Sequence, residues 1–367
     1  MIELRSLVTV SPATVVSAAD THALLAALVP PEAVDRYRDL VDATGICRRR
    51  AVAPLRQLAR LGGVAEREAA YARLAPALAE QAARRALAAA ALAPAAIDTL
   101  IVASSTGHLV PTLAHHVAAR LAVAPAARCL TLDGLGCAGA VRAMSLAADL
   151  LSGAAAGSAL IVAVDLCSLW APPGEISPED ARTSALMGDG AAAVVLAAGD
   201  GASTVAPQLV ASCSLQWPDS LQARGATLTN TGLRHFSSPA RIARLIAAHL
   251  RRDVEAFLES HGVSRHHLAF GLVNPSERRL AHAIADHLDF PPTAKAAADA
   301  VWREHGNTLA AGPVLMLRQL AESLTPADGD VGLLVALGPG ITCDLLLLRW
   351  QGALPVRHDD ATVASLS

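Results

Sequence analysis

The chain has 367 residues, of which 53% are hydrophobic and 17% charged, so it can bury a large core and is neither disordered nor a small disulfide-stapled module. Its formal net charge is −3, from 30 basic and 33 acidic residues with no long run of either sign, which disfavours nucleic-acid and membrane-surface partners. The six cysteines lack paired spacing, which disfavours a metal site and a disulfide framework.

The N-terminal residues show no basic start followed by an apolar run and a cleavage site. No stretch gives a clean apolar span of about 20 residues. We therefore expect a cytoplasmic protein with neither a signal peptide nor a transmembrane helix.

In the first part of the chain, short β-branched runs alternate with long alanine- and leucine-rich segments, a pattern typical of layered α/β proteins. Strands are expected at Thr99–Ala103, Cys129–Leu132, Ala159–Val164 and Ala191–Leu196, and helices at Glu66–Ala91, Leu113–Leu121 and Ala138–Leu151.

The pattern begins again after a Gly/Asp/Ala stretch near residues 199–203, which predicts two similar α/β halves, 1–203 and 204–367. The expected strands are near Gln208–Ser214 and at Leu268–Val273, Gly332–Ala336 and Ile341–Leu348, and the expected helices are Pro239–Ser260, Glu277–His287 and Thr308–Leu324.

Cys137 is the first candidate for chemistry. It follows Gly134 and Gly136, at the start of an amphipathic helix. A helix N-terminus favours the thiolate and can stabilise an oxyanion, while the glycines let a substrate approach the backbone. The alternative is a structural cysteine at a helix start.

The surroundings of Cys137 resemble the type III polyketide synthases, which are chalcone synthase-like and ketoacyl synthase III-like condensing enzymes. The resemblance rests on LGCAGAV, SALMGDGAAAVVL, SSTGHLVP at Ser104–Pro111, REHGNTLAAG at Arg303–Gly312 and ALGPGITCDLLLLRW. These motifs follow the family order over residues 40 to 350. The resemblance implies a thiolase-like fold with αβαβα layers, whose N-terminal half carries the nucleophile and whose C-terminal half carries the asparagine motifs.

In that family a cysteine holds the acyl chain while a histidine and an asparagine polarise thioester carbonyls. The resemblance assigns the asparagine to Asn307 in HGN, although a turn or helix-cap role would suit it equally. The histidine position is occupied by Asn274 in LVNPSE. An amide can donate a hydrogen bond but cannot take a proton from Cys137 near neutral pH, which separates this chain from the family pattern.

One candidate replacement for the histidine is His235, which aligns with an aromatic gatekeeper of the family. Its alternative role is a polar residue at the tunnel mouth. His305 and His108 also lie near motifs, and we interpret them as hydrogen-bonded wall residues.

The other gatekeeper position holds Met187, whose flexible side chain would leave an adaptable passage. With only four Phe and two Tyr in the chain, an aliphatic cavity suited to a non-aromatic acyl chain is expected. Gly338, Pro339 and Gly340 are expected to shape a cavity loop, and Asp189 to have a structural role.

The segment Ala43–Val52 resembles the one whose cations meet the phosphates of coenzyme A (CoA). Arg48 and Arg50 are the candidates, because guanidinium groups suit phosphate oxygens. A solvated surface loop is the alternative.

The leading hypothesis is an acyltransferase that loads an acyl group from a CoA or acyl-carrier-protein thioester onto Cys137 and joins it to malonyl-CoA or another activated nucleophile. Decarboxylative condensation and transfer to a nucleophile that needs no decarboxylation both remain open. The alternatives are a non-catalytic partner of an active condensing enzyme and a cysteine hydrolase. The resemblance also implies a homodimer and no permanently bound cofactor or metal.

Overall fold

The computed structural model describes residues 1–152, 157–170, 177–199, 206–230, 232–274, 277–324 and 326–361. The expected boundary between the halves, after residue 203, lies outside these ranges. Within them, no helix is both long enough and apolar enough to cross a lipid bilayer.

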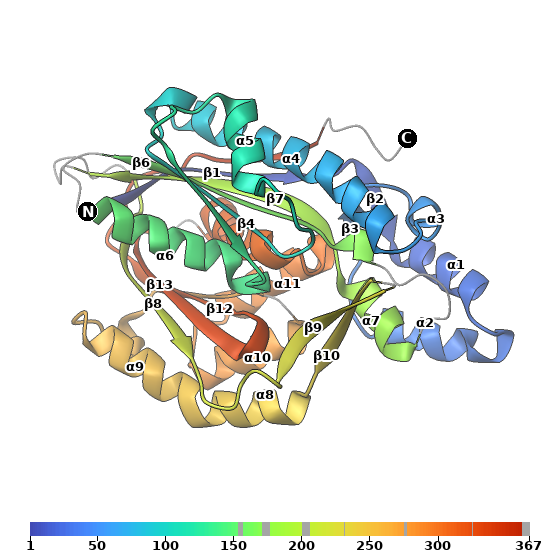
Figure 1. Ribbon diagram of the computed structural model, residues 1–367. Helices are drawn as coiled ribbons and strands as arrows, with labels where there is room; N and C mark the ends of the chain where they lie inside the picture. The colour runs from blue at the N-terminus through green and yellow to red at the C-terminus, as the bar shows by residue number, and fades with distance from the viewer. Residues whose placement is uncertain are drawn as a thin grey trace.

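Two groups of strands with the same plan form the centre of the molecule (Figure 1). The first group is β1 (Ile2–Ser11), β7 (Asp189–Ala198), β6 (Ser158–Leu166), β4 (Thr99–Ser104) and β5 (Arg128–Asp133), in that spatial order. The second is β8 (Gln208–Gln216), β13 (Thr342–Arg349), β12 (Val331–Leu337) and β11 (Phe270–Val273).

The strand directions repeat from one group to the other. In the first group, β7 is antiparallel to both β1 and β6, and the pairs β6–β4 and β4–β5 are parallel. In the second group, β13 is antiparallel to both β8 and β12, and the pair β12–β11 is parallel. Ile2 opposite Leu209 and Glu3 opposite Gln208 join the groups edge to edge, and β14 (Val356–Asp360) adds to β1. The predicted α/β class with two similar halves is therefore confirmed.

The helices form layers around these strands. Helices α4 and α5 lie on the outer side of the first group, α6 and α12 contact strands of both groups, and α8 and α9 lie at the far side of the second (Figure 1). Their bounds are α1 Ala18–Leu28, α2 Val34–Asp42, α3 Leu55–Leu58, α4 Val64–Ala89, α5 Leu113–Leu121, α6 Gly139–Ser152, α7 Pro178–Leu186, α8 Pro239–Leu245, α9 Arg251–Glu259, α10 Arg278–His287, α11 Thr293–His305 and α12 Gly312–Gln319.

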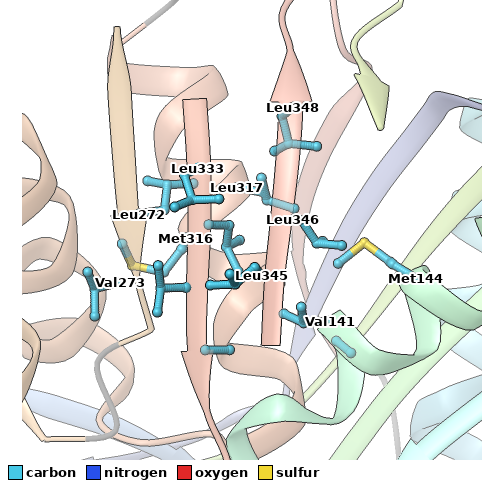
Figure 2. Packing of buried hydrophobic residues seen from close by; sticks show 14 of the residues in the cluster. Val141, Met144, Leu272, Val273, Met316, Leu317, Leu333, Leu345, Leu346 and Leu348 are labelled. Carbon is cyan, nitrogen blue, oxygen red and sulfur yellow. The ribbon is translucent and has the colours of Figure 1, made fainter. Parts of the chain in front are cut away.

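The core consists of two main clusters because the central strands are buried on both faces. Along β6, Ile161 belongs to the cluster between the two strand groups, whereas Leu160 and Val162 belong to the cluster under α4. Figure 2 shows the first cluster, where Val141 and Met144 of α6 approach leucines of β13. Successive residues of β6 point to opposite faces, and because both faces are buried, the sequence of this strand is an uninterrupted apolar run.

The predicted strands and helices are all present, with two differences inside helices. The segment predicted as one helix from Pro239 to Ser260 is divided by a π-helical stretch at Ile246–Leu250. The helix predicted from Thr308 begins with a 3-10 turn at Leu309–Ala311 before α12, and ends in a π-helical stretch at Leu320–Leu324.

The sequence patterns did not predict several elements near the site: α1, α2, α7, α11, the pair β2 (Thr14–Ser17) and β3 (Arg48–Ala51), and the hairpin β9 (Arg224–Thr229) with β10 (Gly232–Ser237). The hairpin consists of short, largely polar strands that are mostly outside the core, which explains its weak hydrophobic pattern.

Candidate active site

Cys137 lies where β5 turns into α6. After Asp133 the chain passes through Gly134 and Gly136, at φ +70° and +48°, into a 3-10 turn that continues as α6. A side chain at Gly136 would be strained by this φ and would meet the ring of Pro339 at 3.1 Å. The two glycines therefore allow the cysteine to sit, buried, beside the loop 338–340.

The cysteine faces a cavity of about 700 Å³, a size that suits a small-molecule substrate. Its walls come from α7, the β9–β10 hairpin, the loop 338–340 and the segment that follows α11. The predicted residues among those that line it are Cys137, Met187, His235, Asn307, Gly338, Pro339 and Gly340.

Asn307 is held in the wall by its own backbone. Its N–H donates to the carbonyl oxygen of Leu186 at 2.8 Å, and its carbonyl accepts from the N–H of Gly188 at 2.9 Å. Its side-chain Oδ1 accepts from the N–H of Leu309 at 3.0 Å and from the thiol of Cys137 at 3.3 Å. The turn role and the position beside the nucleophile therefore coexist in one residue.

Asn274 follows the end of β11, where its backbone N–H donates to Val335 at 3.1 Å. The side chain is 5% exposed and packs so closely on α12 that a Cβ at Gly312 would lie 2.4 Å from Asn274 Oδ1. Within the described residues its Nδ2 has no hydrogen-bond partner. A buried amide donor without a partner is costly in a folded protein and is more common at functional sites.

Burial dominates the electrostatics of Cys137 and raises the pKa of its thiol to about 11. The charge of Arg224 is the largest opposing influence, the amides of Asn307 and Asn274 also lower the pKa, and the carboxyl of Asp165 raises it. Desolvation thus outweighs the stabilisation of the thiolate that the helix N-terminus was expected to give, and Cys137 is a thiol at neutral pH when no substrate is bound.

The buried Asp165 joins the segments around the nucleophile. It accepts hydrogen bonds from the N–H of Ser105 at 2.7 Å, the hydroxyl of Thr106 at 3.1 Å and the N–H of Ala310 at 2.9 Å. Burial raises the pKa of Asp165 to about 7. This carboxyl therefore connects the SSTG segment to the turn that follows Asn307.

The histidines named by the motifs are in different places. His235 lines the cavity from β10, and burial lowers its pKa, so its imidazole is neutral near pH 7. His305 is buried against His358, outside the cavity lining, and burial lowers its pKa to about 3. His108 is exposed, 3.6 Å from Asp133. Of the three, His235 is the one that faces the candidate substrate space.

The arginines proposed for CoA phosphates lie on β3, where strand alternation sets Arg48 and Arg50 on one side and Arg49 on the other. Arg48 is ion-paired with Glu304, and Arg50 with Asp360 at 2.8 Å. Neither lines the cavity of Cys137. Their assignment to CoA stays a prediction.

The GDG segment supports the wall beside Met187. Asp189 is buried and accepts hydrogen bonds from the backbone N–H groups of Val52 at 2.8 Å and Ser168 at 2.7 Å. Burial raises the pKa of Asp189 to about 6. These contacts fit the structural role expected for this carboxyl.

The motifs did not indicate three charged residues that line the cavity: Arg182 of α7, Arg224 of β9 and Glu277 at the start of α10. Two of them belong to elements that the patterns did not predict. The only signals were the proximity of Arg182 to Met187 and of Glu277 to Asn274 along the chain.

Comparisons with known proteins agree with this geometry. The model for the N-terminal domain of chalcone and stilbene synthases matches residues 59–200, and the model for the C-terminal domain of 3-oxoacyl-[acyl-carrier-protein] synthase III matches residues 258–350. A 1,3,6,8-tetrahydroxynaphthalene synthase from Streptomyces peucetius is 32% identical over 338 residues, covering 90% of this chain and 88% of that protein.

Two further relatives extend the comparison. A phloroglucinol synthase from Pseudomonas fluorescens is 28% identical over 317 residues, covering 85% of this chain and 88% of that protein. The crystal structure of 1,3,6,8-tetrahydroxynaphthalene synthase from Streptomyces coelicolor, a bacterial type III polyketide synthase, superposes with a TM-score of 0.87. It is 26% identical in sequence and covers 96% of this chain and 100% of that one.

Proposed function

The chain belongs to the type III polyketide synthase family, with its thiolase-like fold, and on that premise we propose that it is a condensing acyltransferase with Cys137 as the acyl carrier. The observation that carries the proposal is the contact between the Cys137 thiol and Asn307 Oδ1 at the wall of a cavity of about 700 Å³. A nucleophile and a polar amide that face one cavity are the parts that thioester exchange requires.

In the loading step, the thiolate of Cys137 attacks the carbonyl carbon of an acyl-CoA. A bond forms between the carbonyl carbon and the sulfur of Cys137, and the bond between that carbon and the CoA sulfur breaks. Cys137 has given its proton to solvent, and the departing CoA thiolate takes a proton from solvent. The oxyanion formed on the way needs hydrogen-bond donors. The side-chain N–H groups of Asn307 and Asn274 are the candidates.

In the condensation step, malonyl-CoA loses its carboxylate as carbon dioxide, and the electron pair moves onto the thioester as an enolate. The enolate carbon then attacks the acyl group on Cys137, and the cysteine leaves as a thiolate. Because Oδ1 of Asn307 accepts from Leu309, its Nδ2 is the end of the amide that can donate to the enolate oxygen. The Nδ2 of Asn274, which has no hydrogen-bond partner in the part of the chain that the structure describes, is a second donor of the same kind.

A second candidate is acyl transfer without decarboxylation. The observation that favours it is Asn274 itself, since an amide cannot exchange a proton with Cys137. We place it second because decarboxylation requires donors at the enolate oxygen rather than a base, and the two amides can supply them.

We further propose an aliphatic acyl group. Behind Met187, Leu233 and His235 lies a smaller cavity of about 70 Å³ that shares six lining residues, including these three, with the first cavity. Its other walls include Leu24, Leu25, Leu28, Leu55, Leu58 and Trp170. A flexible methionine between two contiguous spaces suits an alkyl chain that extends from the thioester past Met187.

The proposed assembly is a homodimer in which the nucleophile halves meet. Strand β5 ends the strand order, so one of its edges has no neighbouring strand among the described residues. Leu130 of this strand is 36% exposed, and Val110, in the segment between β4 and α5, is 88% exposed. Exposed strand edges with apolar side chains favour association.

The test is intact-protein mass spectrometry after incubation with malonyl-CoA and a series of acyl-CoA compounds. Wild type should gain the acyl mass, and Cys137→Ala should not. Cys343→Ala is the matched control, because Cys343 is also buried but lies on β13 outside the cavity lining.

Other outcomes separate the alternatives. If no acyl-CoA labels wild type and the protein co-purifies with an active condensing enzyme, it is a non-catalytic partner. If CoA is released with neither a condensation product nor a retained acyl group, it is a thioester hydrolase. Labelling by an acyl carrier protein alone would identify the carrier as the donor.

A further inference from the structure

Three charged side chains from three separate elements meet in the cavity wall. Glu277 Oε1 accepts a hydrogen bond from Arg182 at 2.7 Å, and Glu277 Oε2 lies 3.6 Å from a guanidinium nitrogen of Arg224. The side chains are 31% (Arg182), 30% (Glu277) and 21% (Arg224) exposed, and Arg224 is the most enclosed. Glu277 thus contacts both cations.

The β9–β10 hairpin turns Arg224 towards the cavity. In its register Arg224 is opposite Ser237 and Ala226 is opposite His235, which places these four side chains on one face of the hairpin. All four line the cavity that contains Cys137. The neighbouring Arg234 is on the other face, is exposed, and does not line the cavity.

The charged and titratable groups around Cys137 come from several elements, and Asp133 at the end of β5, Arg182 and Glu277 line the cavity with it. Asp165 of β6 is the nearby acid and raises the pKa of the thiol, whereas Arg224 is the largest influence that lowers it. His235 of β10 is neutral because of burial, and Cys167, after β6, is a buried thiol. The asparagines contribute dipoles but no charge.

We propose that Arg224, whose charge Glu277 partly neutralises, is the cation that stabilises the thiolate of Cys137, in a site where Asn274 occupies the family histidine position. This inference rests on the proposed function of Cys137 as the acyl carrier. A guanidinium stays protonated at all relevant pH values and attracts a neighbouring thiolate strongly when both are partly desolvated. It cannot accept a proton, so the proton of Cys137 leaves through solvent.

The geometry assigns opposite effects on the reactivity of Cys137 to Glu277 and Arg182, the two charged residues beside Arg224. Glu277 partly neutralises Arg224, so its removal should strengthen the positive charge that Cys137 experiences. Arg182 holds the carboxylate at the shorter distance, so its removal should let Glu277 turn towards Arg224 and weaken that charge. A merely structural cluster predicts no such reversal of sign.

The test is the rate at which iodoacetamide alkylates Cys137 as a function of pH, measured by mass spectrometry of the peptide that contains Cys137. Arg224→Gln should raise the pH midpoint of alkylation and slow the reaction about tenfold at neutral pH for each pKa unit. Arg224→Lys should recover part of the rate. Glu277→Gln should speed alkylation, and Arg182→Gln should slow it. Arg234→Gln is the matched control and should leave the profile unchanged.

A wild-type alkylation profile in Arg224→Gln, with folding verified by circular dichroism, would overturn the inference. Equal effects of Glu277→Gln and Arg182→Gln would also overturn it. Alkylation needs no acyl donor, so the inference fails or holds separately from the proposed function. If the variants shift the profile but wild type never loads an acyl group, Arg224 keeps its role and the acyl-carrier function is wrong.

Discussion

The thiol of Cys137 and Oδ1 of Asn307, 170 residues apart in sequence, lie 3.3 Å from each other. The backbone N–H of Leu309 donates to the same oxygen at 3.0 Å, so the amide cannot turn over without losing that bond. Its two ends therefore have different tasks. Oδ1 accepts from the protein, and Nδ2 is the end of the amide that can donate to a substrate oxygen.

Asn307→Asp separates these tasks, because a carboxylate of the same shape still accepts from Leu309 but has no N–H to donate. We expect condensation to fall by about 10² to 10³, the usual effect of removing one oxyanion donor, while the protein stays folded. The measurement is release of labelled carbon dioxide from malonyl-CoA, alongside thermal unfolding. Release at the wild-type rate would show that Asn307 is not the donor.

Asn274→His introduces a titratable base where the sequence resemblance places the histidine of the family. An imidazole can take the proton of Cys137, so loading of an acyl-CoA at pH 7 should become at least about tenfold faster and should rise with pH near 6.5. Asn274→Gln, which changes size without adding a base, is the control for the tight contact at Gly312. The same pH profile in both variants would refute the prediction.

Asp165 makes stability depend on pH. Its pKa in the folded protein, about 7, is above the 3.8 of an ordinary aspartate, so its contribution is fully present below pH 4 and is lost as pH rises to 7. We expect the free energy of unfolding of wild type to fall, relative to Asp165→Asn, by about 1.4 kcal/mol per pH unit over this range. Urea unfolding at pH 5 and pH 7 measures the difference. A constant difference would show that Asp165 is charged throughout.

Leu24→Trp should narrow the smaller cavity behind Met187 without touching Cys137. We expect loading of long aliphatic acyl-CoA to fall at least about tenfold, because overpacking an apolar space typically costs 1–3 kcal/mol, while loading of acetyl-CoA stays unchanged in the same variant. Intact-protein mass spectrometry of both donors gives the ratio. Equal loss of both would indicate damage to the fold instead of a shorter acyl site.

Much of the fold could be predicted from local patterns. The apolar runs of β6 and the alanine-rich α4 are long and regular, and both were found at nearly their observed bounds. The β9–β10 hairpin was not predicted, because its strands are short and largely polar and so lack a hydrophobic pattern. Arg224 was missed for that reason.

The sequence by itself determined the local geometry of the nucleophile and its order among motifs. Gly134 and Gly136 permit the positive φ values that turn β5 into α6, and Oδ1 of Asn307 closes a local turn by accepting from the N–H of Leu309 two residues later. These features depend on neighbours within a few residues, so a single chain reveals them.

Only the tertiary structure decided the charge around Cys137. Burial raises the pKa of its thiol, and Arg224 opposes this from a hairpin nearly ninety positions later. Arg48 and Arg50 pair with Glu304 and Asp360 and do not line the cavity of Cys137. Desolvation and Coulomb attraction depend on distances in space, which spacing along the chain does not encode.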